Sequence, residues 1–205
     1  MDRDAVHPAS AGDAPTLNGL EVHEFADVDD WESWLAAHHD SAAGVWLRIA
    51  KKGSPTRSVT AADAGDVALC YGWIDSHRKA NDGATFLQKY SPRRPKGTWS
   101  KVNVERVERL IATGRMRPPG LEEIAKAKAD GRWDAAYESQ RNATVPADLA
   151  AALTASAGAT ARFDALGRTE RYALILRVLK SRGAADRAVR VAKVIAELED
   201  SGPAR

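Results

Sequence analysis

Four short segments of the first hundred residues are typical of β-strands: hydrophobic and polar positions alternate with a period of two in the first, and the second is rich in strand-forming residues. These segments are 20–25, 44–52, 73–80 and 85–91. The last two flank Asn81-Asp82-Gly83, which favours a tight turn, so we expect them to pair as a hairpin. Between the strands, two stretches have a helical period, one after Asp27 or Asp29 and one after Thr60. Each of these three residues can cap a helix N-terminus.

From Ser100 onward the apolar positions follow the longer period of α-helices. Ser100 can cap a helix that ends at Gly114, and further helices that begin at proline or end at glycine continue to residue 199. The last two helical segments predict a helical hairpin, because their apolar positions form one stripe each. Those positions are 172, 175, 176 and 179 in one segment and 188, 191, 195 and 198 in the other.

The pattern as a whole predicts an α+β protein. Residues 1–18 contain few hydrophobic side chains, and we expect them to form a disordered tail. Residues 19–99 should form a small mixed or antiparallel sheet with packed helices. Residues 100–199 should be all-helical, end in the helical hairpin, and form one compact unit with the sheet-containing part.

Composition narrows the functional classes. The chain has 205 residues, 28% of them charged and 44% hydrophobic, with a net charge of +2. This balance argues against a general nucleic-acid coat, which would be strongly basic. The single cysteine excludes an internal disulfide, and no run approaches the roughly 18 apolar residues of a membrane span. The N-terminus does not resemble a signal peptide, so we expect no membrane insertion and a cytosolic location.

The segment "CYGWIDSHR" (70–78) concentrates reactive side chains. In a regular strand, Trp73, Asp75 and His77 point to one face and Arg78 to the other. If the Trp73 face is covered, Asp75 becomes a buried carboxylate, able to act as a general acid or base or to bind an amine. The alternative is a structural Asp that pairs with a neighbour. We interpret Cys70, on an apolar helix face, as a small core residue.

A basic loop follows this strand. Seven basic residues and one acidic residue lie between Arg78 and Lys101, with Tyr90 and Trp99 among them, and the loop leads into the helix N-terminus at Ser100. Arginine pairs and helix N-termini both bind anions, so the sequence indicates an anion site. The candidate ligand-binding residues are Trp73, Arg78, Arg93, Arg94, Trp99, Ser100, Lys101 and Asn103. The alternative is a solvated loop whose arginines pair with acidic residues of the helical part.

The last two helices also carry a basic face, which a solvated amphipathic surface explains and which RNA or an acidic partner would also fit. Its residues are Arg177, Lys180, Arg182, Arg187, Arg190 and Lys193. The histidines form no metal-ligand spacing, and no glycine-rich nucleotide-binding motif is present. We therefore predict no metal site and no cofactor.

Three motifs carry a resemblance to a known family: "ALCYGWID", "SPRRPKGTWSKVN" and "GRWDAAY". With the segments around them and the closing helical hairpin, residues 20–198 resemble the YdeI/OmpD-associated family, also called bacteriocin-protection or OmdA-type proteins. The resemblance implies protection against bacteriocins or cationic antimicrobial peptides and association with an outer-membrane porin. It implies no catalytic residues.

Three functional hypotheses follow. The first is a cytosolic stress or antimicrobial-resistance protein that binds an anionic small molecule or a protein partner through the Trp- and Arg-rich loop. The second is an enzyme that acts on a small anionic substrate with Asp75 as its acid/base. The third is a nucleic-acid-binding protein that uses the same loop and the basic helical face. The oligomeric state stays open.

Overall fold

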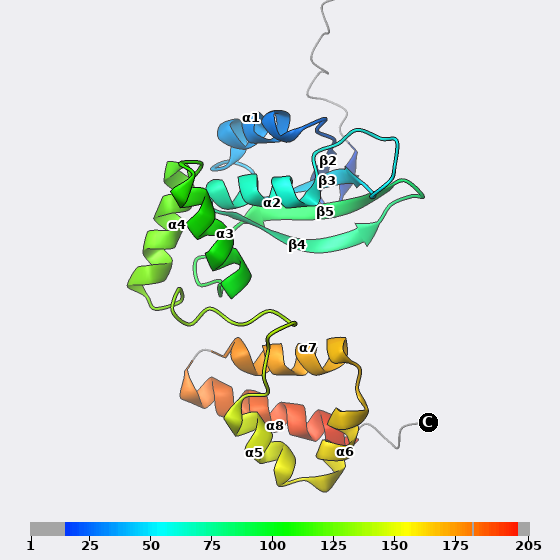
Figure 1. Cartoon of the computed structure of the whole chain (residues 1–205), viewed down its shortest axis with the longest axis vertical. Helices are drawn as coiled ribbons and strands as arrows, with labels where there is room; N and C mark the ends of the chain where they lie inside the picture. Colours follow the sequence, from blue (N-terminus) through cyan, green and yellow to red (C-terminus); the bar gives the residue numbers. More distant parts are fainter. Residues whose placement is uncertain (1–14, 182, 201–205) are drawn as a thin grey trace, which may run out of the picture. The chain divides into compact units, whose positions relative to one another are not determined.

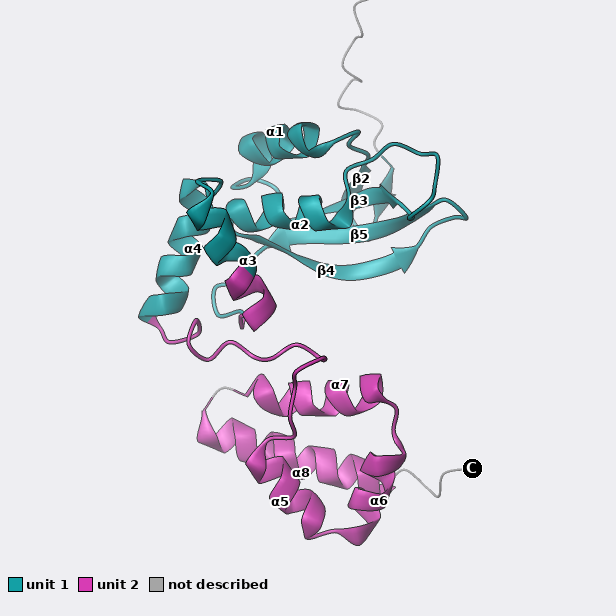
Figure 2. Cartoon of the chain, viewed as in Figure 1, with its two compact units in different colours: residues 1–97, 106–129 teal, residues 98–105, 130–205 magenta. Residues whose placement is uncertain are grey.

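The computed structural model describes residues 15–181 and 183–200 (Figure 1). Most of the predicted tail and Arg182 lie outside these residues. The chain folds into two compact units (Figure 2). The first unit contains the residues up to 97 together with 106–129, and the second contains 98–105 together with the residues from 130 onward. The predicted α+β class is confirmed, with the strands in the first unit and a helical second unit.

The first unit contains a five-stranded mixed sheet in the order β1-β2-β3-β5-β4. Strands β2 and β3 are parallel, and every other neighbouring pair is antiparallel. The four predicted strands are all present, and β4 with β5 forms the predicted hairpin. The strands are β1 (Thr16–Leu17), β2 (Leu20–His23), β3 (Val45–Ala50), β4 (Trp73–Ala80) and β5 (Thr85–Pro92).

Strand β1 lies inside the segment predicted to be a tail, and that part of the prediction is wrong. Asn18 and Gly19 form the turn between β1 and β2, with φ of 53° and 75°. A two-residue hairpin turn of the type favoured by Asn-Gly needs positive φ at both positions. The Asn-Gly pair therefore places a further strand, β1, before Leu20.

Two helices, α1 (Val28–His38) and α2 (Ala61–Cys70), lie over one face of the sheet (Figure 1). Asp27 and Thr60 cap them as predicted, each accepting a hydrogen bond from a backbone N–H three residues on. Helix α1 is the crossover that the parallel pair β2 and β3 requires. The inward side chains of β3 are fully buried against these helices.

Tryptophan supplies much of this core. Trp31 and Trp73 are almost completely buried. Their indole N–H groups donate to the carbonyl oxygens of Ala64 and His39, each at 3.0 Å. These two of the chain's six tryptophans thus serve core packing in this unit, where a buried indole needs an acceptor for its N–H group.

Two further helices, α3 (Lys101–Ala112) and α4 (Pro118–Ala129), follow the loop after β5. The C-terminal part of α3 and the whole of α4 belong to the first unit. Arg106 on α3 donates to the carboxylate of Asp66 on α2 at 2.8 Å, and both side chains are partly buried. This pair fixes α3 against the helical layer.

The second unit is built from α5 (Ala147–Thr154), α6 (Ala157–Ala165), α7 (Arg168–Leu179) and α8 (Ala184–Asp200). Apolar residues from all four helices form one core, so the predicted helical hairpin of α7 and α8 is confirmed as part of a larger bundle. The buried members of that core are Leu149, Leu153, Ala159, Phe163, Leu174, Ile175, Val178, Val194 and Leu198.

Candidate functional site

Asp75 is exposed on β4, so the burial that its proposed acid/base role required is absent. A register shift between Asp75 and Arg78 breaks the regular alternation of the strand. Asp75 pairs with Tyr90 and Arg78 pairs with Gln88, two residues apart on β5, so the two side chains share a face. The prediction that they point to opposite faces is wrong, because a bulge adds a residue that periodicity does not reveal.

Arg78 is held in place on that face. Its Nε donates to the side-chain oxygen of Gln88 at 2.9 Å, and its guanidinium lies 4.4 Å from the centre of the Phe86 ring. Gln88 is buried and donates in turn to the carbonyl oxygen of His77. Arg78 therefore closes an internal network on the sheet and covers an aromatic side chain.

The aromatic residues expected to border a ligand site are part of the core. Trp73 is 1% exposed and Trp99 is 2% exposed, and Tyr90 is also buried. Trp99 packs on Trp133 within the second unit, with ring centres 5.0 Å apart. A ring must be accessible to stack on a ligand or a base, so none of these three provides a stacking surface.

The rest of the predicted loop divides between the two units. Arg94 is exposed in the first unit, and the backbone N–H of the partly buried Arg93 donates to the carbonyl oxygen of Gly72 at 3.0 Å. In the second unit, the Ser100 hydroxyl accepts from the N–H of Asn103 at 3.3 Å, as a helix cap does. Lys101 forms an ion pair with Glu138. The nine predicted site residues are not assembled within either unit.

The basic face of α7 and α8 is largely neutralised. Arg177 pairs with Glu197, Arg187 with Asp148, and Arg190 with Asp186, at 2.6, 2.6 and 2.9 Å. These pairs support the interpretation as a solvated amphipathic surface with internal partners. Arg182, which was included in this face, lies outside the described residues.

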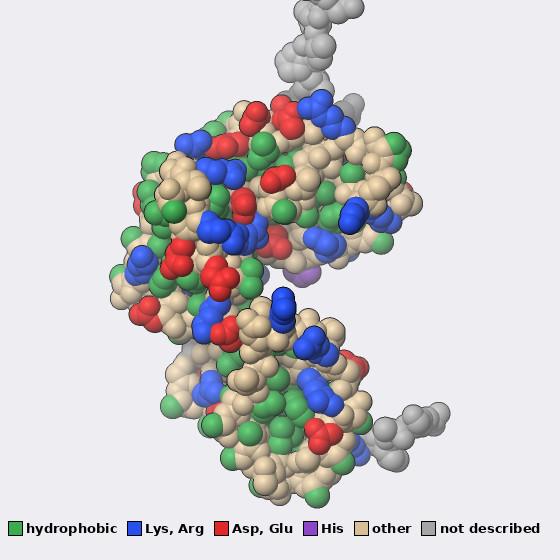
Figure 3. Space-filling view, viewed as in Figure 1, with side chains coloured by type: hydrophobic (Ala, Val, Ile, Leu, Met, Phe, Trp, Pro, Cys, Tyr) green, Lys and Arg blue, Asp and Glu red, His purple; other side chains and the backbone are tan. Residues whose placement is uncertain are grey.

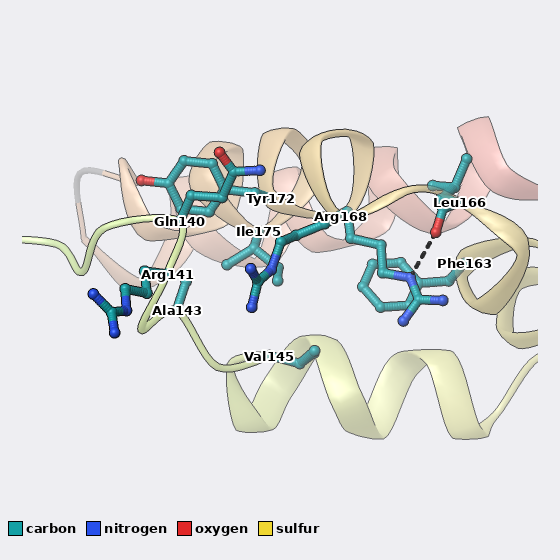
Figure 4. Close-up of a pocket in the computed structure, with 10 residues that line it drawn as sticks. Gln140, Arg141, Ala143, Val145, Phe163, Leu166, Arg168, Tyr172 and Ile175 are labelled. Atoms are coloured by element: carbon teal, nitrogen blue, oxygen red, sulfur yellow. Dashed lines mark hydrogen bonds between the residues drawn. The ribbon is translucent and has the colours of Figure 1, made fainter.

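A cavity of about 430 Å³ lies in the second unit, where sequence reasoning placed no site (Figure 4). Three arginines line it and no acidic residue does. Figure 3 shows hydrophobic side chains exposed between α5 and α7, with Lys and Arg side chains and also acidic side chains around them. The lining residues are Gln140, Arg141, Ala143, Val145, Phe163, Leu166, Arg168, Arg171, Tyr172 and Ile175.

The three arginines differ in how they are held. Arg171 donates from Nε to the carbonyl oxygen of Leu166 at 2.9 Å, donates also to that of Asp164, and lies over the Phe163 ring. Arg141 and Arg168 are exposed, and neither forms an ion pair with any residue that the structure describes. Figure 4 shows Arg168 pointing into the cavity and Arg141 at its edge.

The polar groups beside the arginines are fixed by the surrounding backbone and side chains. The Tyr172 hydroxyl donates to the carbonyl oxygen of Glu138 at 3.0 Å, and the Gln140 amide donates to Thr169 at 3.1 Å. Glu170 accepts the N–H of Gly167 at the start of α7, so that N–H is already occupied. The cavity therefore offers a positive side, formed by side chains, over an apolar floor.

One sequence signal could have indicated this cavity. Arg168 occupies the first position of α7, where the positive end of the helix dipole disfavours a cation. Because a cation is electrostatically unfavourable there, an arginine at this position suggests a functional role. Arg141 lies far from the start of α7 in the sequence, so the sequence does not indicate that Arg141 and Arg168 line one cavity. Only the folded helical bundle brings the two residues together.

No helix in the described part of the chain combines the length and the hydrophobicity that crossing a bilayer demands. Within the same residues, no three His, Cys, Asp or Glu side chains gather as a metal site would require.

Comparison with known families gives two matches. Residues 23–123 match a domain of unknown function (DUF8412), and residues 142–201 match the family described as "Bacteriocin-protection, YdeI or OmpD-Associated". Neither the curated proteins nor the solved structures gave a match. The motifs that carried the resemblance, at 68–75, 91–103 and 131–137, all precede the second matched segment. The match over residues 142–201 is consistent with the resemblance of this chain to the bacteriocin-protection, YdeI- or OmpD-associated family.

Proposed function

We propose that this protein is a stress or antimicrobial-resistance protein whose second unit binds an anionic ligand in the arginine-lined cavity. One observation carries the proposal: Arg141 and Arg168 are exposed beside a cavity with no acidic lining residue, and neither has an ion-pair partner among the described residues. Paired arginines are typical structural cations, whereas unpaired arginines around a cavity remain available to a carboxylate or phosphate.

The position of the cavity in the chain supports a role in the family function. All of its lining residues except Gln140 and Arg141 fall within the segment that matches the family. The Trp- and Arg-rich loop is a weaker candidate, because its aromatic residues are buried and Lys101 has an ion-pair partner. The anion-binding hypothesis is therefore kept, and its proposed location moves from the loop to the helical unit.

The test is a thermal-shift and calorimetric screen of the full chain against organic carboxylates and phosphates. A ligand at 100 times its dissociation constant should stabilise the unit that binds it by about 2.7 kcal/mol. Arg168→Gln removes a charged hydrogen-bond donor and should weaken binding roughly 10- to 100-fold. Arg94→Gln removes the same charge from the loop, and Lys193→Gln removes one from the exposed surface of α8, so both serve as matched controls.

The outcomes separate the two locations. Loss of binding in Arg168→Gln with retention in both controls supports the cavity. Loss in Arg94→Gln with retention in Arg168→Gln would place the site in the loop and overturn the proposal. An equal, small loss in all three variants would show that only net charge matters, which also contradicts a defined cavity site.

A further inference from the structure

The floor of the arginine-lined cavity is formed by apolar side chains. Phe163 and Ile175 are members of the buried core of the second unit, and each is 5% exposed. Val145 and Leu166 pack against that core and are partly buried. A small inorganic anion bound by the arginines would leave the exposed parts of Val145 and Leu166 in contact with water. An apolar group on the same ligand would cover them, which is favourable.

We infer that the ligand of this cavity is an amphipathic organic anion, with a carboxylate or phosphate head and an apolar chain or ring. The inference rests on the proposed function and adds the chemical class of the ligand. The volume of about 430 Å³ lies within the range of roughly 300 to 1,000 Å³ that is usual for small-molecule sites. The cavity thus suits a small molecule.

The positions of the arginines give such a ligand an orientation. Arg171 is fixed by two backbone carbonyl oxygens and lies 5.7 Å from the centre of the Phe163 ring. It closes one side of the floor. Arg168 extends into the cavity from the start of α7 and lies between Ile175 and Val145 in Figure 4. The head group therefore binds at Arg168, and the apolar group lies against Val145 and Leu166, which are more exposed than Phe163 and Ile175.

The absence of acidic lining residues excludes the opposite class of ligand. A cationic amphiphile would place its charge beside three guanidinium groups. Like charges at such short range are unfavourable, and most so where water is partly excluded. A neutral amphiphile would contact the apolar floor but would make no ion pair with Arg168. Both the charge and the apolar group are therefore needed for tight binding.

The experiment compares short and long members of two series by calorimetry on the full chain, below the micelle concentration. The pairs are acetate with octanoate and inorganic phosphate with octyl phosphate, and octanamide serves as the neutral analogue. Each methylene that reaches the floor should raise affinity by up to about fourfold. The long member of each pair should bind at least tenfold more tightly than the short one, and octanamide roughly 10- to 100-fold more weakly than octanoate.

A matched pair of variants assigns the apolar contact. Val145→Thr keeps the shape of the side chain but replaces a methyl group of the floor with a hydroxyl, so it should reduce the difference between acetate and octanoate. Val189→Thr makes the same change at a residue that is 52% exposed and does not line the cavity, and should leave the difference unchanged. If the Val145→Thr variant does not fold, the comparison of short and long ligands on the unmodified protein still tests the inference.

One outcome of this experiment would overturn only the inference about the ligand class, and others would overturn the proposed function as well. Equal affinities of acetate and octanoate, both lost in Arg168→Gln, would overturn this inference and leave the proposed anion site standing. Equal affinities of octanoate and octanamide would overturn both, because the arginines would then have no part in binding. No binding by any of these probes would also overturn both.

Discussion

Gly120 of α4 lies against the carbonyl oxygen of Cys70 at the end of α2, so a β-carbon on Gly120 would be 2.3 Å from that oxygen. No real contact is that short, and the atom in the way belongs to the backbone. We predict that Gly120→Ala lowers the free energy of unfolding by about 1–3 kcal/mol, because α4 must move away from α2. Chemical denaturation followed by circular dichroism measures this change.

Gly158 in α6 is the matched control. It is also a helical glycine, but a β-carbon there would have no heavy atom within 4 Å. Gly158→Ala should therefore raise stability by about 0.5–1 kcal/mol, since alanine loses less backbone entropy in a helix. A loss at both positions would show that the close contact at Gly120 is not the cause.

Cys70 should be unreactive in the folded protein. The side chain is 2% exposed, and burial raises the pKa of its thiol to about 11. At pH 8 only about one thiol in a thousand would then be ionised, and the thiolate is the reactive form. We expect alkylation by iodoacetamide to be very slow in buffer and fast in denaturant. Rapid modification without denaturant would contradict the burial of this residue.

The ion pair between Asp148 of α5 and Arg187 of α8 should make stability depend on pH. The hydrogen bonds from Arg187, at 2.6 and 2.9 Å, hold the pKa of the Asp148 carboxyl below its ordinary value. The stabilisation is therefore fully present above the unfolded pKa of about 3.9. It is lost as pH falls through the lower folded pKa.

The Asp148→Asn variant measures this contribution. Both side chains are more than a third exposed, so solvent screening keeps the expected loss at pH 7 to about 0.5 kcal/mol. The difference between variant and unmodified protein should shrink below about pH 4 and also in high salt. Denaturation midpoints across pH check it, and a difference that persists at pH 2 would assign the effect to packing.

The turn at Asn18-Gly19 should be sensitive to a side chain at Gly19. Its φ of 75° is in the left-handed region, and no neighbouring atom crowds it. Gly19→Ala should cost about 1–2 kcal/mol in the local stability of the β1–β2 pair, measured by amide exchange at Val22. Gly83→Ala, in another open turn but without positive φ, should change little.

The predicted site residues show where sequence periodicity stops being informative. Trp73, Asp75 and Arg78 were placed on the correct strand, yet the bulge changed which face Arg78 occupies. Trp99 was assigned to a ligand surface because it lies among basic residues, but its packing on Trp133 buries it. Neither a β-bulge nor a contact between residues distant in sequence can be predicted from the local pattern of hydrophobic and polar residues.

The sequence by itself determined the elements of this protein: four strands, the helices, the cap at Thr60 and the α+β class. It left the cap of α1 open between Asp27 and Asp29. Those features depend on neighbouring residues, on side-chain period and on backbone preference. Tertiary structure decided what could not be local, namely which tryptophans are buried and which arginines have acidic partners. It also brought Arg141 and Arg168 to one cavity, because side chains far apart in sequence meet only when the segments that carry them pack around a common core.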